Sequence, residues 1–127
     1  MQTATTVNVM LVRFTAIVQV VLGVLFWTGN LLSMIPVHML IGFVFVLSLW
    51  TLSGLAAWAG VSSDLVALGF AWGLVVPVIG LTQTRILPGD LHWIVQVAHL
   101  LVGIIGAGIG DMLANRIGDR LSTPATA

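Results

Sequence analysis

Four long apolar stretches, separated by short polar turns, constrain this chain more than any other feature of its sequence. Each stretch has at least about 20 residues, the length that an α-helix needs to cross the hydrocarbon core of a bilayer. We place the spans at about residues 7–28, 34–59, 64–83 and 91–114. The sequence therefore predicts an all-α four-helix transmembrane bundle, with residues 1–127 forming a single transmembrane domain.

The composition agrees with a chain that lies in a lipid bilayer. Only 6% of the residues are charged and 59% are hydrophobic, whereas soluble domains carry about 25% charged residues. Four arginines balance four aspartates, so no basic surface exists to bind nucleic acid. The absence of cysteine excludes disulfides, thiolate metal sites and covalent haem attachment. Any cofactor must therefore be held non-covalently.

Turn residues define the helix ends. Residues 1–6 are short and polar, and we expect them to be frayed and to precede the first helix. Pro36 fits the first turn of the second helix, and Pro77 is expected to bend the third. Asp90 can cap the fourth helix. No basic segment precedes the first span and no small-residue cleavage site follows it, so we interpret it as a membrane helix and not a signal peptide.

Arginine counting predicts the orientation in the membrane. Arg116 and Arg120 flank the last span and Arg13 lies near the start of the first, where its guanidinium can extend to the lipid headgroups. Only Arg85 lies in a loop on the other side. The positive-inside rule then places both termini in the cytoplasm, in a cytoplasmic membrane of prokaryotic type. Three tryptophans are expected near the interfaces as an aromatic belt: Trp27, Trp58 and Trp93.

Two copies of a short motif, apolar-His-apolar-apolar-apolar-Gly, occur at residues 37–42 and 98–103. An ionisable side chain inside a span costs on the order of 3 kcal/mol unless it is satisfied, so each histidine is a candidate functional residue. The repeat predicts two equivalent helix hairpins related by an axis along the membrane normal. His38 and His99 would then face each other at equal depth.

Two opposed imidazoles in a helical bundle match bis-histidine axial ligation of haem iron. Gly42 and Gly103 follow the histidines by four residues and lie one turn away on the same helix face. They can leave a slot for a flat macrocycle. The sequence thus predicts one b-type haem, with His38 and His99 as metal ligands.

Other interpretations of these residues remain open. The two histidines can pair directly or relay protons, or they can bind a magnesium-tetrapyrrole pigment. The fourth helix has a face of small residues, Gly103, Gly106, Ala107 and Gly110. This face can serve helix packing instead of a cofactor, and it can also contact another subunit.

Further polar residues surround the predicted site. His92 precedes His99 by seven residues, which places it about 10 Å higher on nearly the same helix face. We expect it to hydrogen-bond a haem propionate together with Arg85, or to replace His99 as a ligand. Gln19 and Gln96 can orient an imidazole or bridge two helices.

The paired motifs His38–Gly42 and His99–Gly103, in four spans, resemble the small membrane b-type cytochromes, including the ascorbate-dependent ferrireductase-like proteins and bacterial quinone-coupled superoxide oxidases. The resemblance implies non-covalent haem b held between helices and electron exchange with a quinone or a redox partner protein. The diheme members need four histidines, whereas this chain has three. A single haem is therefore the most that the chain should hold.

We expect a function in electron transfer or redox sensing, because a six-coordinate iron has no open position for oxygen chemistry. Whether the chain is an enzyme or a component of an oxidoreductase is open. It contains no catalytic triad, carboxylate pair or phosphate-binding loop. The competing functions are a cofactor-free accessory subunit of a membrane complex and a small proton-linked transporter.

Overall fold

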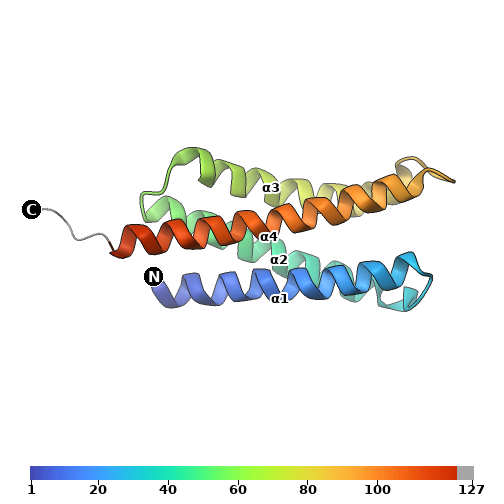
Figure 1. Ribbon diagram of the computed structural model, residues 1–127, viewed down its shortest axis with the longest axis horizontal. Coiled ribbons are helices and arrows are strands. Elements are labelled where there is room, and N and C mark those ends of the chain that lie inside the picture. The colour runs from blue at the N-terminus through green and yellow to red at the C-terminus, as the bar shows by residue number, and fades with distance from the viewer. Residues whose placement is uncertain (123–127) are drawn as a thin grey trace, which may run out of the picture.

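A computed structural model describes residues 1–122 and places them in four long helices joined by short turns (Figure 1). The helices are α1 (Gln2–Trp27), α2 (Ile35–Trp58), α3 (Ser63–Thr82) and α4 (His92–Ser122), with short 3-10 helices η1 (Leu32–Met34) and η2 (Gln83–Arg85) before α2 and after α3. Each long helix is apolar and long enough to cross a membrane. The predicted all-α four-helix bundle is confirmed.

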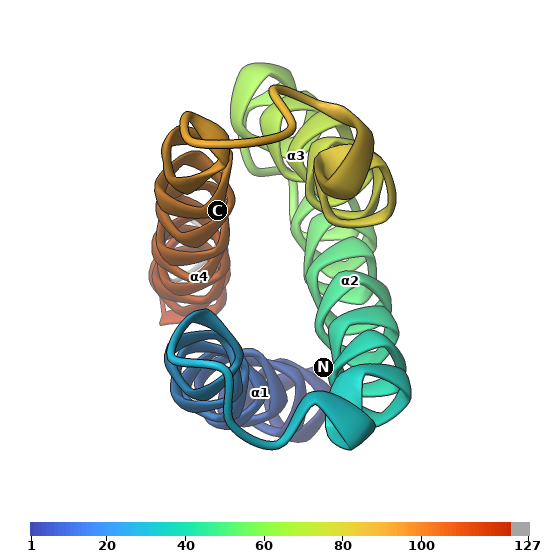
Figure 2. The same cartoon turned by 90° about the vertical axis from the view of Figure 1, so that its right-hand side faces the viewer.

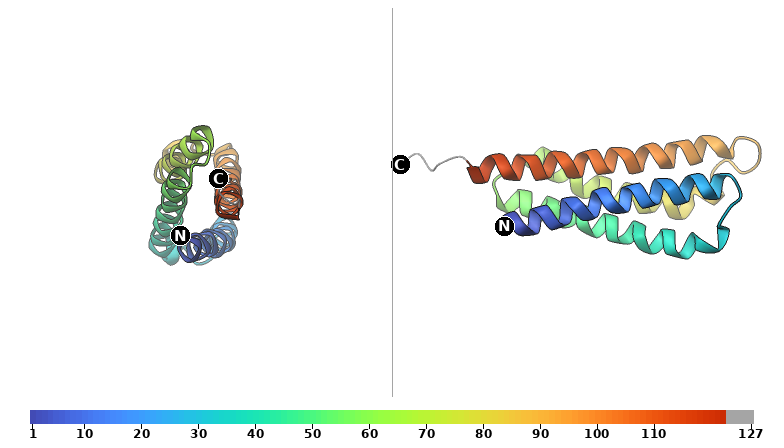
Figure 3. Two further views of the ribbon diagram at one scale, coloured as in Figure 1. Left: turned by 90° about the vertical axis from the view of Figure 1, so that its left-hand side faces the viewer. Right: turned by 60° about the horizontal axis from the view of Figure 1, so that its bottom comes forward.

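The helices surround the bundle axis in the order α1, α2, α3, α4, and α4 returns beside α1 (Figures 2 and 3). The chain alternates direction, so the structure has two distinct ends. The terminal end holds the start of α1, the α2–α3 turn and the end of α4. The loop end holds the α1–α2 and α3–α4 turns (Figure 1). The internal repeat of hairpins stays a prediction.

The first and last helices, α1 and α4, extend beyond the predicted spans at the terminal end. Residues 2–6, expected to be frayed, belong to α1, where the backbone N–H and the hydroxyl of Thr5 both donate to the carbonyl of Met1. At the other terminus α4 continues to Ser122. Hydropathy marks the part of a helix that lipid surrounds, and a helix does not have to end where that part ends.

Helix boundaries at the loop end follow the local sequence. Pro36 lies in the first turn of α2, as predicted, where its missing N–H costs no hydrogen bond. Leu31 and Gly29 adopt positive φ values of 52° and 78° in the preceding turn. Asp90, predicted to cap the fourth helix, lies instead in the turn before α4, which begins at His92.

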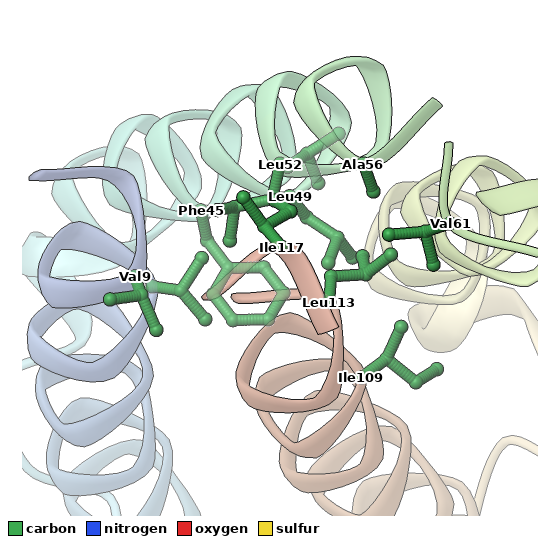
Figure 4. Packing of buried hydrophobic residues seen from close by; sticks show 11 residues of the cluster. Val9, Phe45, Leu49, Leu52, Ala56, Val61, Ile109, Leu113 and Ile117 are labelled. Carbon is green, nitrogen blue, oxygen red and sulfur yellow. The ribbon is translucent and has the colours of Figure 1, made fainter. Parts of the chain in front are cut away.

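The hydrophobic core occupies the half of the bundle near the terminal end (Figure 4). Leu49 and Leu52 of α2 and Leu113 of α4 are completely buried there, and Phe45 lies against them. Nearer the loop end than Phe45 on α2 and Gly106 on α4, Val95 is the one buried hydrophobic residue within residues 1–122. The apolar side chains of the half near the loop end are directed mainly outward.

Helices α2 and α3 approach closely through two glycines of α3. Gly69 lies against the Ser53 hydroxyl and Gly73 against the indole of Trp50, with no space for a Cβ atom at either glycine. The Trp50 indole also donates a 3.1 Å hydrogen bond to the carbonyl of Phe70. Small residues four apart permit such close contact between membrane helices, so this pair fixes the α2–α3 interface.

Candidate functional site between the histidine-bearing helices

The imidazoles of His38 and His99 meet inside the half of the bundle near the loop end. Their ring centres are 6.3 Å apart, and the ring planes are inclined by 53°. His38 lies in the first turn of α2, and His99 lies two turns into α4. These two helices are parallel and lie diagonally across the bundle, so the predicted meeting of the two histidines is confirmed. Neither ring hydrogen-bonds the other, which disfavours direct pairing.

Residues of the other two helices lie against the imidazoles. Phe26 of α1 contacts His38 edge to face, with ring centres 5.4 Å apart. Gly80 of α3 lies against His99, and a Cβ atom at this glycine would be 3.2 Å from Cε1 of the imidazole. All four helices therefore contribute to the site.

Gln19 of α1 is the third polar side chain of the site. Its Nε2 atom lies 2.8 Å from the position that a Cβ atom of Gly42 would occupy. The predicted slot at Gly42 is thus filled by an amide. The sequence leaves open whether Gln19 orients an imidazole or bridges two helices. In the structure its amide contacts α2 at Gly42, one turn along that helix from His38.

Three buried side-chain atoms have no hydrogen-bond partner within residues 1–122: Nδ1 of His38, Nδ1 of His99 and Oε1 of Gln19. All three lie in the half of the bundle near the loop end. An unpaired buried polar group costs about 1–3 kcal/mol. The two Nδ1 atoms belong to the facing imidazoles, and the Oε1 atom belongs to the amide beside Gly42, one turn from His38. These atoms are therefore candidates to hold a ligand.

The remaining small residues of the predicted site have different surroundings. A Cβ atom at Gly103 would meet nothing within 4 Å, so open space lies beside this residue as predicted. Gly106 packs against Phe45 and Trp72, and Gly110 packs against Val12. These two glycines therefore serve packing within the bundle and are not free to contact a neighbouring helix.

His92 and Arg85 lie at the loop end, near the α3–α4 turn. Nδ1 of the half-buried His92 is 3.3 Å from the carbonyl oxygen of Ile86, the residue after Arg85. Arg85 itself is exposed in η2. Both residues are separate from the meeting point of His38 and His99, and their predicted role toward a propionate stays a prediction.

Arg13 is placed differently from the sequence-based expectation. Its Nε atom is 2.9 Å from Oδ1 of Asp111 on α4, so the guanidinium forms an ion pair and does not depend on lipid headgroups. The sequence could not predict this pair, because the two residues are 98 positions apart. They meet because α4 packs beside α1.

Sequence analysis did not assign Gly80 to the site. The chain carries a signal that could have found it, because α3 and α4 are antiparallel helices joined by a short turn. Counting outward from that turn puts Gly80 two residues and His99 seven residues inside their helices, so both lie near the loop end but not at the same count. The identity of the residue that Gly80 touches still required the rotation of each helix about its own axis, which only the folded structure gives.

Within residues 1–122 no three His, Cys, Asp or Glu side chains gather at one place to hold a metal ion. The site therefore offers two imidazoles and no further protein ligand of these types. Comparisons with models of protein families, with curated proteins and with solved structures found no match for this chain.

Proposed function

We propose that the chain is a membrane-embedded b-type haem protein that transfers electrons or senses redox state, with His38 and His99 as axial ligands of one haem. The facing imidazoles carry this proposal. Imidazole nitrogen is a ligand of haem iron, and two imidazoles whose ring centres are about 6–7 Å apart could both reach one ion between them. The observed separation is 6.3 Å.

The donor set also fits a tetrapyrrole better than a bare metal ion. Two imidazoles leave the coordination of a transition metal incomplete, and a macrocycle supplies the four missing nitrogen ligands itself. Gly103 adds space on the same helix as His99, since nothing lies within 4 Å of its Cβ position.

Bound haem would supply one-electron chemistry, and the protein would supply position and surroundings. His38 and His99 would hold the iron from α2 and α4. A ligating histidine donates its second ring N–H to an acceptor, and Gln19 offers an unpartnered buried oxygen beside α2. Because His38 lies three residues into α2 and His99 seven residues into α4, the site is near the loop end. A quinone in the bilayer or a redox protein at this surface would be the electron partner.

A haemin titration tests the proposal. Protein purified in detergent without haem should bind haemin with a stoichiometry of one per chain and develop the sharp reduced-state bands of a low-spin, bis-histidine iron after dithionite is added. Protein from haem-replete cells should show the same bands. Colourless protein that fails to bind haemin would refute the proposal, and proton flux in liposomes would then become the measurement of interest.

Gly80 provides a test of the site geometry. We expect Gly80→Val to weaken haemin binding about tenfold and to shift the reduced-state bands, because the added side chain would press against the His99 ring. Mutation of residues that support a metal ligand typically costs about 10–100-fold in affinity. The affinity and spectrum are measured by haemin titration. Gly54→Val is the matched control, since a Cβ atom there meets nothing within 4 Å; equal loss in both variants would contradict the predicted contact.

A further inference from the structure

The ion pair between Arg13 and Asp111 lies on the outer surface of the bundle, although both residues belong to apolar membrane helices. In a single chain 52% of the arginine side chain and 41% of the aspartate side chain are exposed. Ionisable residues in membrane spans almost always face the bundle interior or a water-filled cavity. The exposure of this pair therefore requires a cause.

The depth of the pair follows from α3. This helix has 20 residues, about 30 Å, so it just crosses the hydrocarbon core. The Cβ position of Gly69 on α3 is 2.9 Å from Cδ1 of Leu113 on α4. Asp111 precedes Leu113 by two residues, so it lies at least about six residues, or 9 Å, inside the first residue of α3. Arginine can extend its long side chain toward the headgroups, but the short aspartate cannot. In a single chain the Asp111 carboxylate would contact lipid.

The face of α4 that carries Asp111 is unusually polar and small. Gly108, Asp111 and Asn115 lie three and four residues apart, so they share one helix face. Gly108 and Asn115 are exposed, and nothing lies within 4 Å of the Cβ position of Gly108. The opposite face of α4 is the buried one: Gly106, Ile109, Gly110, Leu113 and Ile117. Arg13 and Asn115 also line a groove of about 240 Å³ between α1 and α4.

We propose that a second copy of this chain covers this face, which we call the Asp111 face and define by Arg13, Gly108, Asp111 and Asn115. A twofold axis along the membrane normal would bring the two α4 helices together in parallel. Arg13 of each copy would then reach Asp111 of the partner subunit as well as its own. The dimer thus removes the charges from lipid and joins them in a four-charge network.

The chemistry of the Asp111 face favours an identical partner. One positive and one negative group lie side by side, so the face is complementary to its own twofold image. The Asn115 amide both donates and accepts and can pair with its copy, and such asparagine pairs fix register between parallel helices. Gly108 allows close approach of the two backbones. This inference is independent of haem binding and differs from the contact predicted through Gly106 and Gly110, which pack inside the bundle.

Cysteine crosslinking in membranes tests the dimer, since the natural chain contains no cysteine. Gly108→Cys should form disulfide-linked dimers on mild oxidation, because the Cα atoms across a disulfide lie within about 7 Å. The control is Leu47→Cys, an exposed position of α2 away from this face, which should stay monomeric. Equal crosslinking of both variants would indicate random collision and would overturn the proposal.

Counting of labelled chains by single-molecule photobleaching in liposomes gives a second, independent readout. We expect two chains per spot for the natural sequence and about 3- to 30-fold weaker dimerisation for Asp111→Asn, the range measured for polar contacts between membrane helices. Single chains at all protein-to-lipid ratios would overturn the proposal. The same result is expected if a different protein, and not a second copy, covers the Asp111 face in cells.

A mixed-charge experiment tests whether Arg13 reaches the partner subunit. Chains with Arg13→Asp and chains with Asp111→Arg should each dimerise poorly alone, because like charges meet. When the two are co-expressed with different tags, they should form mixed dimers about tenfold more than either self-pair. Mixed dimers at the level of the self-pairs would contradict an ion pair between subunits.

Discussion

His38→Ala and His99→Ala should each abolish the reduced-state absorption bands of protein purified from haem-replete cells. Loss of residues that only support a metal ligand already costs about 10–100-fold in affinity, so loss of an axial ligand should weaken haemin binding at least about 100-fold. The measurement is the visible spectrum of the oxidised and dithionite-reduced protein, together with haemin titration. Both variants should lose the bands, because each removes one of the two facing imidazoles.

His92→Ala serves as the control for these two variants. This histidine lies at the start of α4 near the Ile86 carbonyl, away from the paired rings, so its removal should leave the bands in place. Partial recovery of the bands in His99→Ala on addition of imidazole would separate lost ligation from lost folding. Bands that survive in His99→Ala and disappear in His92→Ala would refute the assignment of the ligands.

Gly73→Ala should destabilise the bundle by about 1–3 kcal/mol, the usual cost of overpacking a tight contact. The added methyl group would overlap the Trp50 indole, whose position is fixed by its hydrogen bond to Phe70. Either α2 and α3 must separate or this hydrogen bond must break. The free energy of unfolding can be measured in mixed micelles by titration with sodium dodecyl sulfate.

Gly54→Ala is the matched control for that experiment. Gly54 lies on α2 with nothing within 4 Å of its Cβ position, so the higher helix propensity of alanine should leave stability unchanged or raise it by up to about 1 kcal/mol. A similar loss of stability in both variants would mean that glycine at position 73 is not required for helix contact.

The contact between His38 and His99 is the part of the candidate site that could be predicted from the sequence. Four spans with short turns make the second and fourth helices parallel, and the repeated motif places a histidine in the first half of each, three residues into α2 and seven residues into α4. Those two facts predicted a contact between residues 61 positions apart, and the rings meet. The repeated motif was useful because it singled out one histidine on each of two parallel helices, and the constant rise per residue of a helix then puts both near the loop end.

The contacts around the histidines were less predictable. Gly42 was expected to face open space, but the Gln19 amide fills that position, and Gly80 touches His99 without any motif to mark it. Arg13 was expected to reach the headgroups, and it pairs with Asp111. Each of these depends on which helix lies beside which and on how each helix is rotated about its axis. In nearly uniform apolar helices, hydrophobic periodicity gives little information about that rotation.

Composition and hydropathy alone predict the class of this protein: four apolar helices of alternating direction in a nearly uncharged chain, with one histidine within each of the second and fourth helices. The hydrophobic cost of leaving apolar stretches in water is large and local, so it can be predicted from composition and length. The packed structure was needed to find where the core lies, which glycines receive a neighbouring side chain, and that Arg13 and Asp111 meet on the outer surface of the bundle. Those features depend on contacts between helices distant in sequence, where many arrangements bury similar apolar area and close packing selects one.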